Sequence, residues 1–140
     1  MRIFLITLSI LLTSIGSIMA KNLYNFSIQD IDGNTVNLDK FKGKPILLVN
    51  TASRCGFTKQ YANLSNLHRE YFEKNLVIIG TPSNSFHQEL SNNEEVKEFC
   101  LVNYETKFII SEIISVVGEN AHPIYSLSLI HISEPTRRSY

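Results

Sequence analysis

The length, charge and composition of the chain limit what it can be. Its 140 residues allow one domain at most. The 13 Lys and Arg residues equal the 13 Asp and Glu residues, and the basic side chains are scattered along the sequence. This balance excludes a basic surface that would steer the protein to nucleic acid or to an anionic membrane. A hydrophobic content of 44% is that of a globular protein.

The first twenty residues have the pattern of a secretory signal peptide. Arg2 supplies the positive charge, residues 3–18 are mostly apolar, and Ala20 ends a cleavage site. The alternative is an uncleaved anchor helix, but the apolar stretch is short for spanning a membrane and polar residues follow at once. We therefore expect a secreted or periplasmic protein, with a signal peptide at 1–20 and one domain at 21–126.

The N-terminal part of that domain predicts β structure. Residues 25–30 and 34–38 alternate apolar and polar side chains around Asp32-Gly33, a dipeptide typical of a hairpin turn. Residues 39–43 form a short polar turn with at most one helical turn. Residues 45–50 are continuously apolar, which predicts a parallel or central strand buried on both faces.

The central part alternates helix and strand. Apolar residues recur at helical spacing over 56–74, Asn75 is a helix stop, and 76–81 is a second buried-strand pattern, so we expect a βαβ unit. A polar loop follows at 83–93. Then come a helix over 94–103, capped by Asn92 or Asn93, apolar segments at 108–110 and 113–117, and a helix start at 121–126. The pattern predicts an α/β fold.

Cys55 lies where the apolar strand ends and the predicted helix begins. Helix N-termini carry partial positive charge and free N–H donors, so a thiol placed there loses its proton more easily. We therefore expect redox chemistry at Cys55. The alternatives are a buried inert thiol and, because an exported chain with two cysteines favours a disulfide, a structural bond between Cys55 and Cys100.

With these elements placed, the chain resembles the glutathione peroxidase family in its cysteine form. The resemblance covers about 23–125 and rests on blocks that keep the family's order and nearly its spacing: Asn50–Gly56, Pro82–Phe86, Gln88–Glu89, Asn93–Cys100 and Gly118–Pro123. It implies a thioredoxin-like fold with an N-terminal β-hairpin. It also implies an enzyme that reduces hydrogen peroxide or organic hydroperoxides, with glutathione or a thioredoxin-like dithiol as electron donor.

The resemblance also implies roles for individual residues. Cys55 corresponds to the peroxidatic cysteine, Gln88 to a polar partner of the thiolate or the peroxide, and Cys100 to the resolving cysteine of members that use thioredoxin. Plain core packing for Cys100 and an ordinary loop position for Gln88 are the alternatives. We expect no cofactor and no metal, since His87 and His122 lack other ligands at suitable spacing.

The sequence departs from the family pattern in several places. Ser85 replaces the usual Gln of the Asn-Gln-Phe run, and Leu90 replaces the Pro of Gln-Glu-Pro. The family's Trp-Asn-Phe element, which supplies its catalytic Trp and Asn, finds no match, as the chain has no Trp.

The C-terminal segment resembles no part of the family. Residues 127–137 look like translated sequencing-adapter sequence. We therefore expect 127–140 to be a non-native tail, the domain to be incomplete at its C-terminus, and the chain to be a weak peroxidase.

Two other functional hypotheses remain. A thiol–disulfide oxidoreductase of the same fold is disfavoured, because Thr58 stands where that class has its second cysteine. A non-enzymatic exported domain stapled by a Cys55–Cys100 disulfide is the third.

Overall fold

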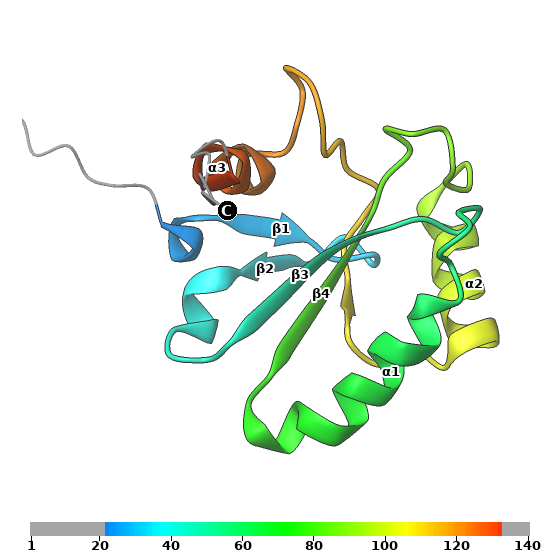
Figure 1. Cartoon of the computed structure of the whole chain (residues 1–140), viewed down its shortest axis with the longest axis horizontal. Coiled ribbons are helices and arrows are strands. Elements are labelled where there is room, and N and C mark those ends of the chain that lie inside the picture. The colour runs from blue at the N-terminus through cyan, green and yellow to red at the C-terminus, as the bar shows by residue number, and fades with distance from the viewer. Residues whose placement is uncertain (1–21, 133–140) are drawn as a thin grey trace, which may run out of the picture.

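The computed structural model describes residues 22–132, in which a small hairpin packs beside a three-stranded sheet (Figure 1). The hairpin pairs β1 (Ser27–Gln29) with β2 (Thr35–Asn37) antiparallel. In its turn, Gly33 has a φ of +82°, and the Asp30 carboxylate accepts the Asn34 N–H at 2.8 Å. The predicted hairpin is confirmed. Short 3₁₀ helices flank it, η1 (Leu23–Asn25) and η2 (Leu38–Phe41).

The main sheet contains β3 (Ile46–Thr51), β4 (Val77–Pro82) and β5 (Ile109–Ile110), all parallel and in the order β3-β4-β5. Helix α1 (Gln60–Tyr71) and the 3₁₀ helix η3 (Phe72–Lys74) connect β3 to β4, which confirms the predicted βαβ unit. Asn75, with a φ of +67°, ends this helical segment as expected.

Two apolar clusters cover the two faces of the sheet. Neighbouring residues of β4 point to opposite faces, so Ile78 joins one cluster and Ile79 the other. The first cluster lies under α1 and α2 (Asn93–Tyr104), and the second lies under the hairpin and α3 (Pro123–Ile132) (Figure 1). In α2 the Asn92 side chain accepts the Glu95 N–H at 2.9 Å, which confirms Asn92 as the cap.

Two sequence expectations need correction, and others are not tested by the structure. Residues 46–49 of β3 are half-buried rather than buried on both faces, because among residues 22–132 β3 is an edge strand. The helix begins at Gln60 rather than at residue 56, since 53–59 form consecutive turns and a bend. The described part of the chain ends with α3 (Pro123–Ile132), and the domain end at residue 126 stays a prediction. The predicted signal peptide and residues 133–140 lie outside the described residues.

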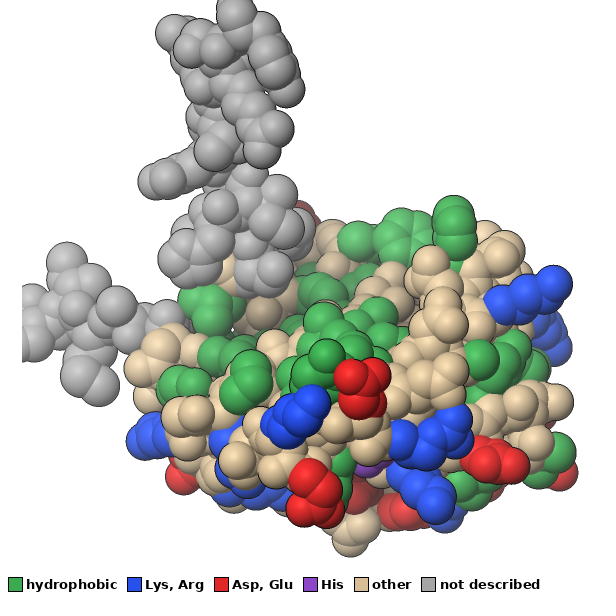
Figure 2. Space-filling view, turned by 60° about the horizontal axis from the view of Figure 1, so that its bottom comes forward, with side chains coloured by type: hydrophobic (Ala, Val, Ile, Leu, Met, Phe, Trp, Pro, Cys, Tyr) green, Lys and Arg blue, Asp and Glu red, His purple; other side chains and the backbone are tan. Residues whose placement is uncertain are grey.

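The surface carries mixed charges. Lys and Arg side chains are interspersed with Asp and Glu on the face shown in Figure 2. This agrees with the balanced composition. Among the described residues, no helix combines the length and the apolar character that crossing a membrane requires.

Gly80 provides a test of how tightly the sheet is packed. A Cβ on this residue of β4 would lie 2.9 Å from Ile110 Cδ1 and 3.1 Å from Phe108 Cε2. We expect Gly80→Ala to lower the free energy of unfolding by about 1–3 kcal/mol through overpacking, as measured by urea denaturation. Gly56→Ala is the matched control, because its Cβ would meet nothing within 4 Å. Equal stability of the two variants would contradict the packing argument.

Candidate active site

Cys55 lies on a turn beyond the carboxyl end of β3 and is half-buried. It precedes α1 rather than starting it, so the predicted position at a helix N-terminus is not observed. The Phe57 N–H nevertheless donates to Cys55 Sγ at 3.5 Å. This backbone donor, rather than a helix N-terminus, is the polar contact that the described residues give the sulfur.

Thr58 organises this turn, a role that sequence reasoning missed. Its Oγ1 accepts the Cys55 N–H at 2.9 Å. Its hydroxyl lies within donating distance of two carbonyls, that of Ala52 at 2.9 Å and that of Cys55 at 2.6 Å. The side chain thus fixes the backbone on both sides of the cysteine. The signal was available, since Ser and Thr hydroxyls commonly close local turns through the backbone.

Gln88 lies in the loop after β4, and its backbone contacts the cysteine turn. Its carbonyl accepts the Arg54 N–H at 2.8 Å, next to Cys55. A hollow of about 60 Å³ beside the thiol is lined by residues of β3, of the cysteine turn and of α1, among them Thr51 and Tyr61, and not by Gln88. The structure therefore brings the Gln88 backbone close to the site without placing its amide in the hollow.

Glu89 is a second residue that the sequence did not single out. It is buried, with 5% of its surface exposed. Its Oε1 accepts the Ser53 N–H at 3.0 Å and the Leu90 N–H at 2.8 Å. Together with the Arg54–Gln88 bond, this carboxylate attaches the cysteine turn to the loop at 83–92. Glu89 belongs to a block that carries the family resemblance, but its burial depends on how the two loops meet and leaves no local signal in the sequence.

Cys100 lies in the apolar cluster between α1, α2 and the sheet, with 1% of its surface exposed. Burial raises the pKa of the Cys100 thiol to about 11, and the negative charge of Glu89 acts in the same direction. Both cysteines belong to the described residues and both are free. The structure therefore shows one half-buried thiol and one buried thiol. It does not contain the Cys55–Cys100 disulfide that the hypothesis of a non-enzymatic domain requires.

Tyr61 of α1 lies between the two cysteines. It lines the hollow beside Cys55 and belongs to the same buried cluster as Cys100. Burial raises the pKa of its hydroxyl, which lies near the side chains of Thr51 and Cys100. No hydrogen bond of standard geometry satisfies this hydroxyl within residues 22–132. Tyr61 thus borders the surroundings of both thiols.

Comparison with known proteins identifies the family. The family model described as glutathione peroxidase matches residues 23–128. The "Glutathione peroxidase" of Lactococcus lactis is 43% identical over 105 residues, which are 74% of this chain and 67% of that protein. The "Glutathione peroxidase-like peroxiredoxin 2" of Saccharomyces cerevisiae is 41% identical over 109 residues, 77% of this chain and 67% of that protein.

A solved structure agrees with these matches. The crystal structure of T. cruzi GPX1 superposes with a TM-score of 0.57 at 30% identity, covering 76% of this chain and 63% of that one. The chain thus spans about two thirds of the length of these relatives. The predicted thioredoxin-like fold is confirmed, and the chain belongs to the glutathione peroxidase family.

Proposed function

We propose that this protein reduces hydrogen peroxide or organic hydroperoxides through the thiolate of Cys55. The observation that carries the proposal is the placement of Cys55 on a surface turn with a backbone N–H directed at its sulfur, beside a small hollow. The names of the relatives support it, since one is called a glutathione peroxidase and another a glutathione peroxidase-like peroxiredoxin.

In the first step the Cys55 thiolate attacks one oxygen of the O–O bond. The sulfur takes that oxygen as a sulfenic acid, and the other oxygen leaves with a proton as water or an alcohol. Thr58 and Glu89 hold the turn on which the sulfur sits. Gln88 is the proposed polar partner, in a loop whose backbone accepts the Arg54 N–H next to Cys55.

In the second step Cys100 resolves the sulfenic acid. Its sulfur bonds to Cys55 Sγ, and the hydroxyl of the sulfenic acid leaves with the thiol proton as water. Because Cys100 is buried in the reduced protein, α2 has to loosen before the two sulfurs meet. An external thiol then reduces the disulfide, either glutathione or a thioredoxin-like dithiol. We place this activity outside the cytoplasm, on the basis of the signal peptide predicted at 1–20.

Cys55→Ser tests the core of the proposal. We expect one equivalent of hydroperoxide to be consumed by the parent chain in a single turnover and not by Cys55→Ser, because serine provides no thiolate. Cys100→Ser is the control and should still form a sulfenic acid, detected by mass spectrometry of the dimedone adduct. Peroxide consumption by Cys55→Ser equal to that of the parent would refute the assignment.

Thr58→Val tests the positioning of the thiol. The substitution keeps the shape of the side chain but leaves the Cys55 N–H and the Ala52 carbonyl without their partner. We expect the rate constant for oxidation of Cys55 to fall about tenfold. The matched control is Thr35→Val, on the exposed side of the hairpin, which should keep the parental rate.

The pH dependence of alkylation separates the two thiols. The reactive form is the thiolate, and burial raises the pKa of Cys100 to about 11, so its thiolate is scarce in the folded protein until the pH approaches that value. We expect iodoacetamide to label Cys55 at neutral pH and Cys100 only in strongly alkaline solution, measured by peptide mass spectrometry. Rapid labelling of Cys100 at neutral pH in the folded chain would contradict its burial.

A further inference from the structure

The last turn of α2, which carries Cys100, is attached to α1 by two side chains. The buried hydroxyl of Ser65 donates to the Tyr104 carbonyl at 3.0 Å. The ring of Tyr61 stacks on the ring of Tyr104, with 5.3 Å between the centroids and 24° between the planes. Because Tyr104 is the last residue of α2, both contacts have to break before the turn with Cys100 can unwind.

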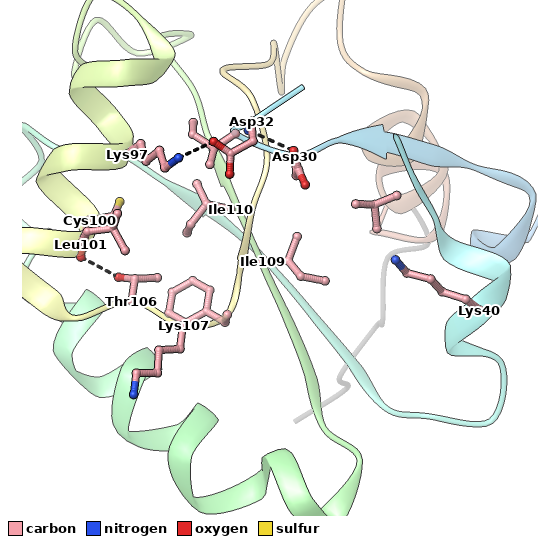
Figure 3. Close-up of a pocket in the computed structure, with 13 residues that line it drawn as sticks. Asp30, Asp32, Lys40, Lys97, Cys100, Leu101, Thr106, Lys107, Ile109 and Ile110 are labelled. Atoms are coloured by element: carbon pink, nitrogen blue, oxygen red, sulfur yellow. Dashed lines mark hydrogen bonds and ion pairs between the residues drawn. The ribbon is translucent and has the colours of Figure 1, made fainter. Parts of the chain in front are cut away.

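The backbone that follows α2 is hydrogen-bonded to the helix end and contains one residue with a strained, positive φ. The Thr106 hydroxyl and N–H donate to the Cys100 carbonyl at 3.0 Å and 3.3 Å, and Figure 3 shows these residues beside one another at the end of the helix. Between them, Glu105 has a φ of +47°. Left-handed backbone favours glycine, so an exposed glutamate in this position makes the helix end less stable than a glycine would.

We propose that Ser65 and Tyr61 are positioning residues that set the rate at which Cys100 leaves the core, and that the strained Glu105 keeps this rate high. We call Ser65, Tyr61, Tyr104 and Glu105 the Cys100 latch. Opening of the latch is a local unfolding of the last turn of α2, so each contact changes the population of the open form. The opening itself does not depend on the proposed function, whereas the fate of the released thiol does.

Under the proposed function the latch decides between two outcomes for oxidised Cys55. Released Cys100 bonds to the sulfenic sulfur and water leaves, which gives the disulfide. If release is slow, a second hydroperoxide transfers one oxygen to the same sulfur, which gives a sulfinic acid and water or an alcohol. The latch therefore controls how much hydroperoxide the chain tolerates before it is irreversibly inactivated.

The opening can be measured without any peroxide. In the reduced full chain carrying Cys55→Ser, alkylation of Cys100 at fixed pH reports the population of the open form. We expect Ser65→Ala to speed this labelling about fivefold, through the loss of one hydrogen bond. We expect Glu105→Gly to slow it about fivefold, through the loss of backbone strain.

Matched controls separate the latch from general effects on stability. Glu105→Ala removes the same charge but keeps a Cβ at the positive φ, and Asn63→Ala changes an exposed residue of α1. Both should label within twofold of the parent. The proposal fails if Ser65→Ala and Glu105→Gly also stay within twofold while circular dichroism shows folded chains. If Ser65→Ala does not fold, the labelling rates of the two Glu105 variants decide: the proposal stands if Glu105→Gly is labelled more slowly than Glu105→Ala and fails if the two rates are equal.

A second measurement connects the latch to the chemistry. With Cys55 present and excess hydroperoxide, mass spectrometry should find more disulfide in Ser65→Ala and more sulfinic acid in Glu105→Gly than in the parent. An unchanged ratio, with altered labelling rates, would refute the role of the latch in choosing the product. The absence of any oxidation at Cys55 would instead refute the proposed function. The labelling rates would then still test whether the latch controls the exposure of Cys100.

Discussion

The parallel pairing of β3 with β4 is the constraint on which the site depends. Its register sets Thr51 opposite Pro82, so both strands end at the same level and the segments that follow them meet. One segment carries Cys55 and the other carries Gln88 and Glu89. Functional groups in open α/β sheets commonly gather at this carboxyl edge. The hydrogen bonds from Ser53 and Arg54 to the second loop then hold the two segments together.

The sequence predicted the elements whose signals are local. Asp32-Gly33 marked the hairpin, Asn75 the end of a helical segment and Asn92 a helix cap, and each is found in the structure. Turn and cap residues act through backbone conformation and nearby N–H groups, so short stretches of sequence are sufficient to recognise them. The family, recognised from motif blocks in order, is confirmed by the comparisons.

Other features depend on tertiary contacts and were missed. The helix was predicted to begin near Gly56, yet Phe57 is 73% exposed, so its apolar side chain marks no buried helical face. Glu89 looked like one more polar loop residue until two loops enclosed it. Thr58 was considered only as the position that lacks a second cysteine, whereas its hydroxyl holds the turn. The roles of Cys55, Gln88 and Cys100 remain predictions.

The contrast between the two cysteines has a consequence for the order of events. Cys55 is half-buried on a turn, while Cys100 is buried in the apolar cluster that also contains Tyr61. An oxidant arriving from solvent therefore encounters one sulfur and not the other, whatever the intrinsic reactivities of the two thiols. The packing alone therefore gives a dissolved oxidant access to the outer thiol before the inner one.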